Sequence, residues 1–125
     1  MSKLSFKYST MGAGKSLELL KVAHNYEQIG KRVILLTSSL DNRNGIGIIS
    51  TRIGLTRPAV AISSNDNIFN MIFLDTTKDS TPISCILIDE SQFLNKNQIH
   101  QLTEITDKLN IPVICYGLRS DFMLE

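Results

Sequence analysis

The chain has 125 residues, of which 42% are hydrophobic and 20% are charged, and its formal net charge is +1. This length suits a single domain, the near-neutral charge argues against a nucleic-acid-binding surface, and no apolar run approaches the ~20 residues that a membrane span needs. The N-terminus also lacks the uninterrupted apolar core of a signal peptide, so we expect a cytoplasmic protein.

The first predicted element is a buried strand that ends in a phosphate-binding loop. Apolar residues alternate over positions 4–8, and a helical pattern begins directly after Ser16. The run between them resembles the motif G-x-x-x-x-G-K-[ST], although Ser9 replaces its opening glycine. It consists of Ser9, Thr10, Met11, Gly12, Ala13, Gly14, Lys15 and Ser16. Backbone N–H groups, the helix dipole and the Lys15 ammonium would hold nucleotide phosphates, and the Ser16 hydroxyl would bind Mg²⁺.

The next two segments favour a parallel sheet. Apolar residues recur at helical spacing over 16–29, and Gly30 is placed to end this helix in a left-handed conformation. Residues 32–37 follow as an apolar run without alternation, which is typical of a strand covered by helices on both faces. We therefore predict a parallel α/β sheet.

Residues 38–57 are polar, contain three glycines and predict a long loop or an irregular ribbon. Arg43 or Arg52 could reach a bound phosphate from this segment, although a solvated surface position is the competing interpretation for each. Further along we expect a strand at 58–62, a short helix capped by Asn65 or Asp66, and a polar connection over 76–82.

A second candidate site is the apolar run 85–88, which ends in Asp89 and Glu90. A carboxylate at the C-terminal end of a strand beside a phosphate loop can hold Mg²⁺, and its neighbour can accept a proton from a nucleophile. Neighbouring strand residues point to opposite faces of a sheet. Both acids can therefore act in one site only if the chain leaves the sheet between them or just after them.

The last predicted elements are a helix and a strand. Asn95 is expected to cap an amphipathic helix over 95–109, with Gln98 three residues further on. A buried strand over 111–116 should then place residues 117–122 on the ligand side of the sheet.

Both cysteines, Cys85 and Cys115, lie in apolar runs and are predicted to be buried. Their spacing does not suit a zinc site, and the cytoplasmic interpretation disfavours a disulfide between them. We assign no chemistry to His24 or His100.

Four segments together resemble the thymidine kinase family of the bacterial and vertebrate-cytosolic type. They are residues 9–16, 41–43, 89–93 and 116–122, with 52–55 between the second and the third. The similarity covers nearly the whole chain. It implies an α/β fold of the P-loop NTPase class, with a RecA-like parallel sheet flanked by helices.

The resemblance also implies the reaction and the roles of the site residues. ATP, together with Mg²⁺, would donate its γ-phosphate to the 5′-hydroxyl of thymidine in nucleoside salvage, and Glu90 would be the general base. Residues 9–16 and Arg43 would contact phosphate. Asp89, Glu90, Ser91 and Gln92 would lie on the metal and phosphate side. The apolar nucleoside pocket would comprise Met11, Phe93, Leu118 and Phe122.

Members of this family continue past the position of Glu125 into a smaller zinc-binding domain with a loop that closes over the nucleoside. The sequence is therefore expected to be a nucleotide-binding domain, 1–125, of a truncated thymidine kinase with weakened activity, and the family resemblance implies a tetramer. Two alternatives stay open. One is a module that binds ATP or a sister subunit without turnover, and the other is an ATPase of the same fold with a different partner.

Overall fold

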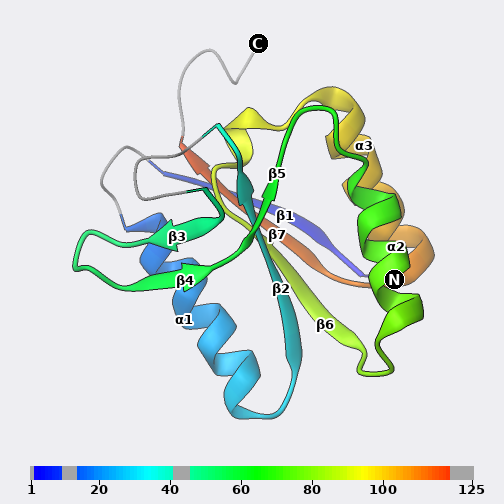
Figure 1. Ribbon diagram of the computed structural model, residues 1–125, viewed down its shortest axis with the longest axis horizontal. Helices are drawn as coiled ribbons and strands as arrows, with labels where there is room; N and C mark the ends of the chain where they lie inside the picture. The colour runs from blue at the N-terminus through cyan, green and yellow to red at the C-terminus, as the bar shows by residue number, and fades with distance from the viewer. Residues whose placement is uncertain (1, 10–13, 41–45, 119–125) are drawn as a thin grey trace.

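A five-stranded parallel sheet forms the centre of the computed structural model, which describes residues 2–9, 14–40 and 46–118 (Figure 1). The strand order is β1-β7-β6-β2-β5, and every neighbouring pair is parallel. The strands are β1 (Leu4–Ser9), β2 (Arg32–Ser38), β5 (Val60–Ile62), β6 (Ile83–Ile88) and β7 (Val113–Leu118). This sheet confirms the predicted α/β fold class.

Helices cover both faces of the sheet. Helix α1 (Lys15–Gln28) packs on one face, and α2 (Ile68–Lys78) and α3 (Lys96–Glu104) pack on the other (Figure 1). On β6, Cys85 and Leu87 join the cluster under α1, whereas Ile86 and Ile88 join the cluster under α2 and α3. Burial on both faces explains the continuous apolar runs of the central strands, and each fully buried Leu or Ile contributes about 1.5–3 kcal/mol. None of the helices in the described part of the chain is long and apolar enough to cross a membrane.

The first strand is less buried than the sequence predicts. Phe6 is 38% exposed and Tyr8 is 43% exposed, and their rings stack with centroids 5.9 Å apart. The expectation of a buried strand was wrong because β1 is an edge strand that pairs with β7 alone among the described strands. Alternation of apolar and polar residues with a period of two does not distinguish an edge strand from an inner strand.

The polar segment after β2 contains a regular hairpin. Strands β3 (Ile48–Ser50) and β4 (Thr56–Pro58) pair antiparallel to form a ribbon. The expected strand at 58–62 is divided between β4 and β5, because the chain passes from the ribbon to the main sheet at Ala59, whose N–H donates to the carbonyl of Gly47 at 2.7 Å. Arg57 binds both carboxylate oxygens of Glu27, at 3.1 and 2.9 Å, and so fixes the ribbon to α1.

The N-cap of α2 is Asn67, whose side chain accepts from the N–H of Asn70 at 3.0 Å. The predicted caps, Asn65 and Asp66, were wrong, and Asp66 instead accepts from the N–H of Ser63 at 2.8 Å. Helix α2 also continues to Lys78, so the expected polar connection begins later than predicted. Within this last turn the hydroxyls of Thr76 and Thr77 donate to carbonyls three residues back, those of Phe73 and Leu74.

The predicted capping box of α3 is confirmed. The side chain of Asn95 accepts from the N–H of Gln98 at 2.8 Å, and the Gln98 side chain accepts from the N–H of Asn95 at 3.2 Å. A π-helical turn, η2 (Ile105–Leu109), completes the predicted helix. Gly30 has a φ of 76° after α1, as its position predicts.

The free energy of unfolding is expected to fall as the pH rises from about 9 to about 12. Burial raises the pKa of the Cys115 thiol from 9.0 to about 12 and that of the Tyr116 phenol from 10.0 to about 12. The folded state thus favours the protonated forms, whose stabilisation is complete below the unfolded pKa values and is lost as the pH rises through this window. The loss for one such group is at most about 1.4 kcal/mol per pH unit.

Urea unfolding followed by circular dichroism at several pH values measures this loss. Cys115→Val removes the thiol at similar volume, so its stability should fall less steeply than that of the wild type between pH 9 and 10. Equal slopes for the two proteins would contradict the assignment.

Candidate active site

The N-terminus of α1 contributes the first residues of the site. Gly14 precedes the helix with φ 78° and ψ 24°, a left-handed conformation that glycine adopts without strain, and it provides no side-chain cap to the first N–H groups. Lys15 and Ser16 are the first two residues of the helix. Their side chains therefore extend from the end of α1 at which anions bind most favourably.

The C-terminal end of β6 supplies the two acids. Asp89 directly follows the last residue of the strand, and its backbone N–H donates to the carbonyl of Leu36 at 2.8 Å. Glu90 then adopts φ 56° and ψ 41°, a left-handed conformation that costs a non-glycine residue roughly 1 kcal/mol and is concentrated at functional sites. The chain thus turns out of the sheet immediately after Asp89, as required for both acids to serve one site.

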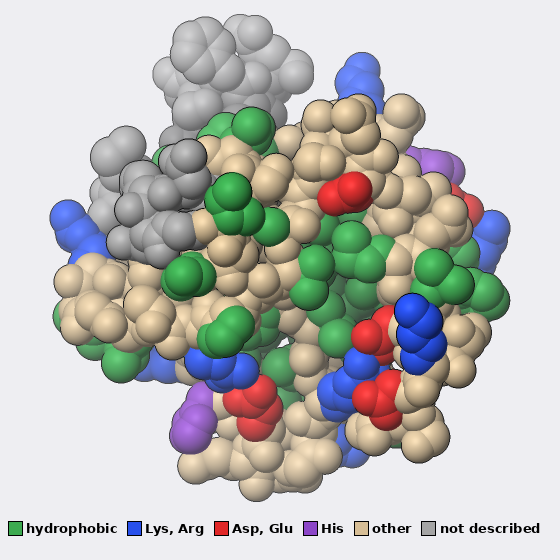
Figure 2. All heavy atoms as spheres, viewed as in Figure 1, with side chains coloured by type: hydrophobic (Ala, Val, Ile, Leu, Met, Phe, Trp, Pro, Cys, Tyr) green, Lys and Arg blue, Asp and Glu red, His purple; other side chains and the backbone are tan. Residues whose placement is uncertain are grey.

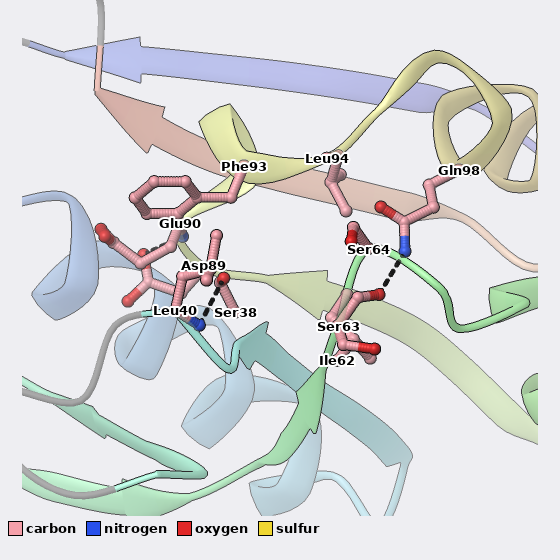
Figure 3. A pocket seen from close by; sticks show the side chains of 10 residues that line it. All are labelled: Ser38, Leu40, Ile62, Ser63, Ser64, Asp89, Glu90, Phe93, Leu94 and Gln98. Carbon is pink, nitrogen blue, oxygen red and sulfur yellow. Dashed lines mark hydrogen bonds between the residues drawn. The ribbon is translucent and has the colours of Figure 1, made fainter.

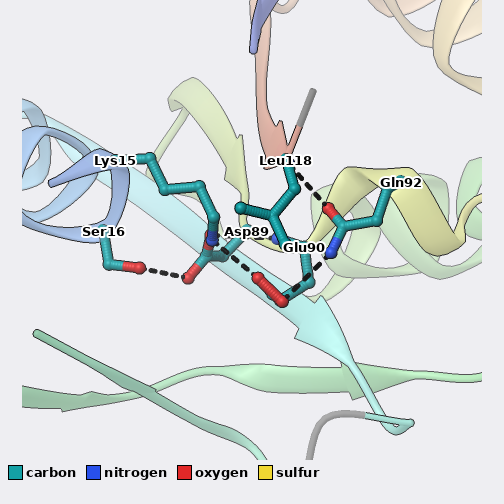
Figure 4. Close-up of polar contacts among 6 residues, drawn as sticks. All are labelled: Lys15, Ser16, Asp89, Glu90, Gln92 and Leu118. Atoms are coloured by element: carbon teal, nitrogen blue, oxygen red, sulfur yellow. Dashed lines mark hydrogen bonds and ion pairs between the residues drawn. The ribbon is translucent and has the colours of Figure 1, made fainter. Parts of the chain in front are cut away.

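Lys15 joins the two acids. Its Nζ lies 2.8 Å from Oδ1 of Asp89 and 2.6 Å from Oε1 of Glu90, and Oγ of Ser16 donates to Oδ2 of Asp89 at 2.8 Å (Figure 4). The Lys15 side chain is 13% exposed, and each acid side chain is 5% exposed. Burial lowers the pKa of Lys15, but the two carboxylates outweigh burial and raise it overall. The ammonium therefore stays protonated at neutral pH.

The short 3₁₀ helix η1 (Ser91–Phe93) follows these acids in the chain, and its Gln92 side chain links Glu90 to β7 by hydrogen bonds. Nε2 of Gln92 donates to Oε2 of Glu90 at 3.3 Å, and Oε1 of Gln92 accepts from the N–H of Leu118 at 3.1 Å (Figure 4). Ser91 is buried beside Gly117, and a Cβ added to this glycine would lie only 2.6 Å from Oγ of Ser91.

A pocket lies next to Glu90 at the C-terminal ends of β2, β5 and β6 (Figure 3). The Phe93 ring forms one wall of it, close to Glu90. Its lining consists of Ser38, Leu40, Ile62, Ser63, Ser64, Asp89, Glu90, Phe93, Leu94 and Gln98. Three of these, the two acids and Phe93, were predicted from the sequence to belong to a site. Several of the other lining residues lie at or just after the carboxyl ends of parallel strands. Because these ends meet at one edge of the sheet, that position in the sequence could have identified them as candidates for the pocket.

Comparison with known proteins identifies the family. The thymidine kinase family profile matches residues 2–125. The chain belongs to the thymidine kinase family. It is 49% identical over 122 residues to a thymidine kinase of Streptococcus pyogenes serotype M1, covering 98% of this chain and 62% of the relative. It is also 49% identical over 123 residues to a thymidine kinase of Francisella tularensis subsp. tularensis, covering 98% of this chain and 61% of the relative.

The family membership confirms the resemblance seen in the sequence, and the chain spans about three fifths of the length of these thymidine kinases. Of the residues that the resemblance selected, the structure brings six together at one end of the sheet. They are Lys15, Ser16, Asp89, Glu90, Gln92 and Leu118, the last through its backbone N–H. Ser91 and Phe93 flank Gln92 on η1.

Some positions that were predicted from the sequence lie outside the described residues. They are Thr10, Met11, Gly12, Ala13, Arg43 and Phe122, together with the side chain of Ser9. Arg52 lies exposed in the turn of the ribbon. Within 2–9, 14–40 and 46–118, no group of three or more His, Cys, Asp or Glu side chains is arranged to hold a metal ion.

Gly117→Ala is expected to lower stability and any activity that depends on Glu90. The added Cβ would lie 2.6 Å from Oγ of Ser91, 3.0 Å from Oε1 of Gln92 and 3.2 Å from the backbone nitrogen of Gln92, so these two side chains or η1 itself must shift. Overpacking of this kind costs about 1–3 kcal/mol, which urea unfolding can measure. Ser91→Ala removes the nearest atom and should restore part of the loss. If the single and double variants were equally destabilised, the steric explanation would be wrong.

Proposed function

We propose that this chain transfers the γ-phosphate of ATP to the 5′-hydroxyl of thymidine. The bond between the γ-phosphorus and its bridging oxygen breaks, a bond to the 5′-oxygen forms, the hydroxyl proton passes to Glu90, and ADP and dTMP are released. The observation that carries the proposal is the contact of Lys15 with both Asp89 and Glu90 in a chain of the thymidine kinase family.

In this proposal Lys15 and the N-terminus of α1 bind the ATP phosphates, together with the loop 9–16. Lys15 would exchange its carboxylate partners for phosphate oxygens, because a single ammonium has three donors and can shift between neighbouring anions. Arg43 is proposed to add a second cationic contact to phosphate.

Ser16 and Asp89 suit a magnesium ion. The Ser16 hydroxyl and a carboxylate oxygen of Asp89 lie 2.8 Å apart, and such hard oxygen donors are the ligands that Mg²⁺ prefers. When bound there with ATP, the ion would neutralise charge on the phosphates.

Glu90 is the proposed general base. Its carboxylate is 5% exposed and lines the pocket beside Phe93, so a hydroxyl bound in that pocket would meet a base largely shielded from water. We propose that Phe93, with Met11, Leu118 and Phe122, contacts the sugar and the thymine ring. Ser91 and Gln92 are proposed to lie on the metal and phosphate side of the site.

Apolar side chains exposed on and beside the ribbon support a proposed homo-oligomer. These side chains are Ile46, Ile48, Ile53, Leu55 and Val60. Green side chains are scattered over the ribbon side of the space-filling view (Figure 2). Contacts between copies of the chain would remove such surface from water, and a tetramer is the assembly we propose. A cytoplasmic location and the absence of nucleic-acid and membrane partners stay predictions.

ADP formation by the purified chain tests the proposed function. Thymidine should stimulate ADP release from ATP, whereas 5′-deoxythymidine, which has no 5′-hydroxyl, should not. Equal stimulation by both nucleosides would contradict the proposal. Stimulation by nucleic acid alone would favour the ATPase alternative, and ATP binding without any turnover would favour the binding module.

A further inference from the structure

Gln92 connects the proposed base to the end of a different strand. Its Nε2 donates to Oε2 of Glu90, and its Oε1 accepts from the backbone N–H of Leu118, the last residue of β7. Glu90 and Leu118 are thus held by the two ends of one amide group (Figure 4). We propose that Gln92 is a positioning residue that fixes the orientation of the Glu90 carboxylate against β7.

The chemistry of the two partners suits an amide in this position. The N–H of Leu118 can only donate, so it must meet an acceptor, and the ionised carboxylate of Glu90 can only accept, so it must meet a donor. A glutamine side chain presents one of each across a single planar group. A glutamate in its place would keep the acceptor for Leu118 but would put a second carboxylate against Glu90.

Close packing holds Gln92 in place. A Cβ at Gly117 would lie 3.0 Å from Oε1 of Gln92 and 3.2 Å from its backbone nitrogen, so η1 rests directly on the backbone of β7. Ser91, on the same turn, is 3% exposed and also faces Gly117. The amide therefore has a rigid support, which positioning of a neighbouring side chain requires.

The two oxygens of Glu90 have different partners. Oε1 contacts Lys15, whereas Oε2 contacts Gln92. This step rests on the proposed function: if Lys15 moves toward ATP phosphates, Oε1 gives up its contact with the ammonium while Gln92 still holds Oε2. The carboxylate would then keep its orientation at the moment when it acts as a base.

Two variants separate the two hydrogen bonds. Gln92→Met removes both at similar length, and Gln92→Glu keeps only the acceptor for Leu118. We expect both to lower kcat for dTMP formation by about 10- to 100-fold, with KM for ATP and thymidine within about threefold of the wild type. Full activity of Gln92→Glu would show that only the contact with Leu118 matters. A loss confined to the KM for ATP would assign Gln92 to phosphate binding, and either result would overturn the proposal.

Gln101→Met is the matched control, because Gln101 also accepts a backbone N–H, that of Ile68 at 2.7 Å, but lies on α3 away from Glu90. It should leave kcat unchanged even if it lowers stability. In a Glu90→Gln background, Gln92→Met should cause little further loss, because a residue that acts through Glu90 has nothing left to position. Additive losses would contradict positioning.

A spectroscopic readout separates this proposal from the proposed function. The ¹³C resonance of the Glu90 side-chain carboxyl should shift in Gln92→Met and Gln92→Glu but not in Gln101→Met, whether or not the wild type makes dTMP. If the wild type were inactive while the resonance shifted as expected, the proposed function would fail and the Gln92 contact would stand. An unshifted resonance in both Gln92 variants would overturn the positioning role.

Discussion

Glu90→Gln is expected to lower the rate of dTMP formation by about 10²–10⁴-fold, the usual contribution of a general base. Glutamine has nearly the same shape but cannot accept a proton at neutral pH. Because Lys15 keeps its contact with Asp89, the phosphate-binding end should stay intact, and the affinity for Mg·ATP should remain within a few-fold. Initial rates and calorimetric titration with Mg·ATP measure the two effects separately.

Glu104→Gln provides the matched control. Glu104 lies on α3, pairs with Lys108 at 3.0 Å and is remote from the acids of β6, so the same change of charge there should leave turnover unchanged. A Glu90→Gln protein that formed dTMP as fast as the wild type would show that Glu90 is not the base.

Replacement of Lys15 is expected to have the second large effect. Lys15→Ala removes a charged hydrogen-bond donor to phosphate, which is worth about 1.5–3 kcal/mol, or about 10- to 100-fold in ATP affinity. It also leaves Asp89 and Glu90, each 5% exposed, without their shared ammonium. Removal of one partner from a buried ion pair costs about 3–5 kcal/mol of stability. Calorimetry with Mg·ATP and urea unfolding measure these losses.

Lys15→Arg keeps the protein foldable for this test, because the guanidinium still compensates the two acids. Its planar fork does not reproduce the compact ammonium, so ATP-dependent turnover should still fall while stability largely recovers. Lys7→Ala, which breaks an exposed pair with Glu18, is the control for loss of a surface cation. Wild-type turnover in Lys15→Arg and Lys15→Ala would remove Lys15 from the proposed mechanism.

The central fold could be predicted because its signals are local. The apolar runs of β2 and β6 required cover on both faces, and the Asn95 and Gln98 pair marked the start of α3 through backbone capping. The exposure of Phe6 and Tyr8 could not be predicted, because it depends on which strand lies at the edge of the sheet.

The candidate site was predictable in its charges but not in its geometry. Lys15, Asp89 and Glu90 were identified from motifs, but the left-handed backbone of Glu90 has no sequence signal, since glutamate rarely adopts it. The link from Gln92 to Leu118 joins residues 26 positions apart and depends on how closely η1 packs on β7. Ser63 and Ser64 line the pocket because they follow β5, and the place of β5 beside β2 in the sheet could not be predicted from the sequence.

The fate of the γ-phosphate of ATP decides whether this chain is a thymidine kinase in its own right. The purified chain is incubated with γ-³²P-labelled Mg·ATP and thymidine, and the products are separated to show where the labelled phosphate goes. We expect labelled dTMP from the wild type and at least about 100-fold less from Glu90→Gln. Label released only as inorganic phosphate, or dTMP formed equally by both proteins, would contradict the proposed phosphoryl transfer.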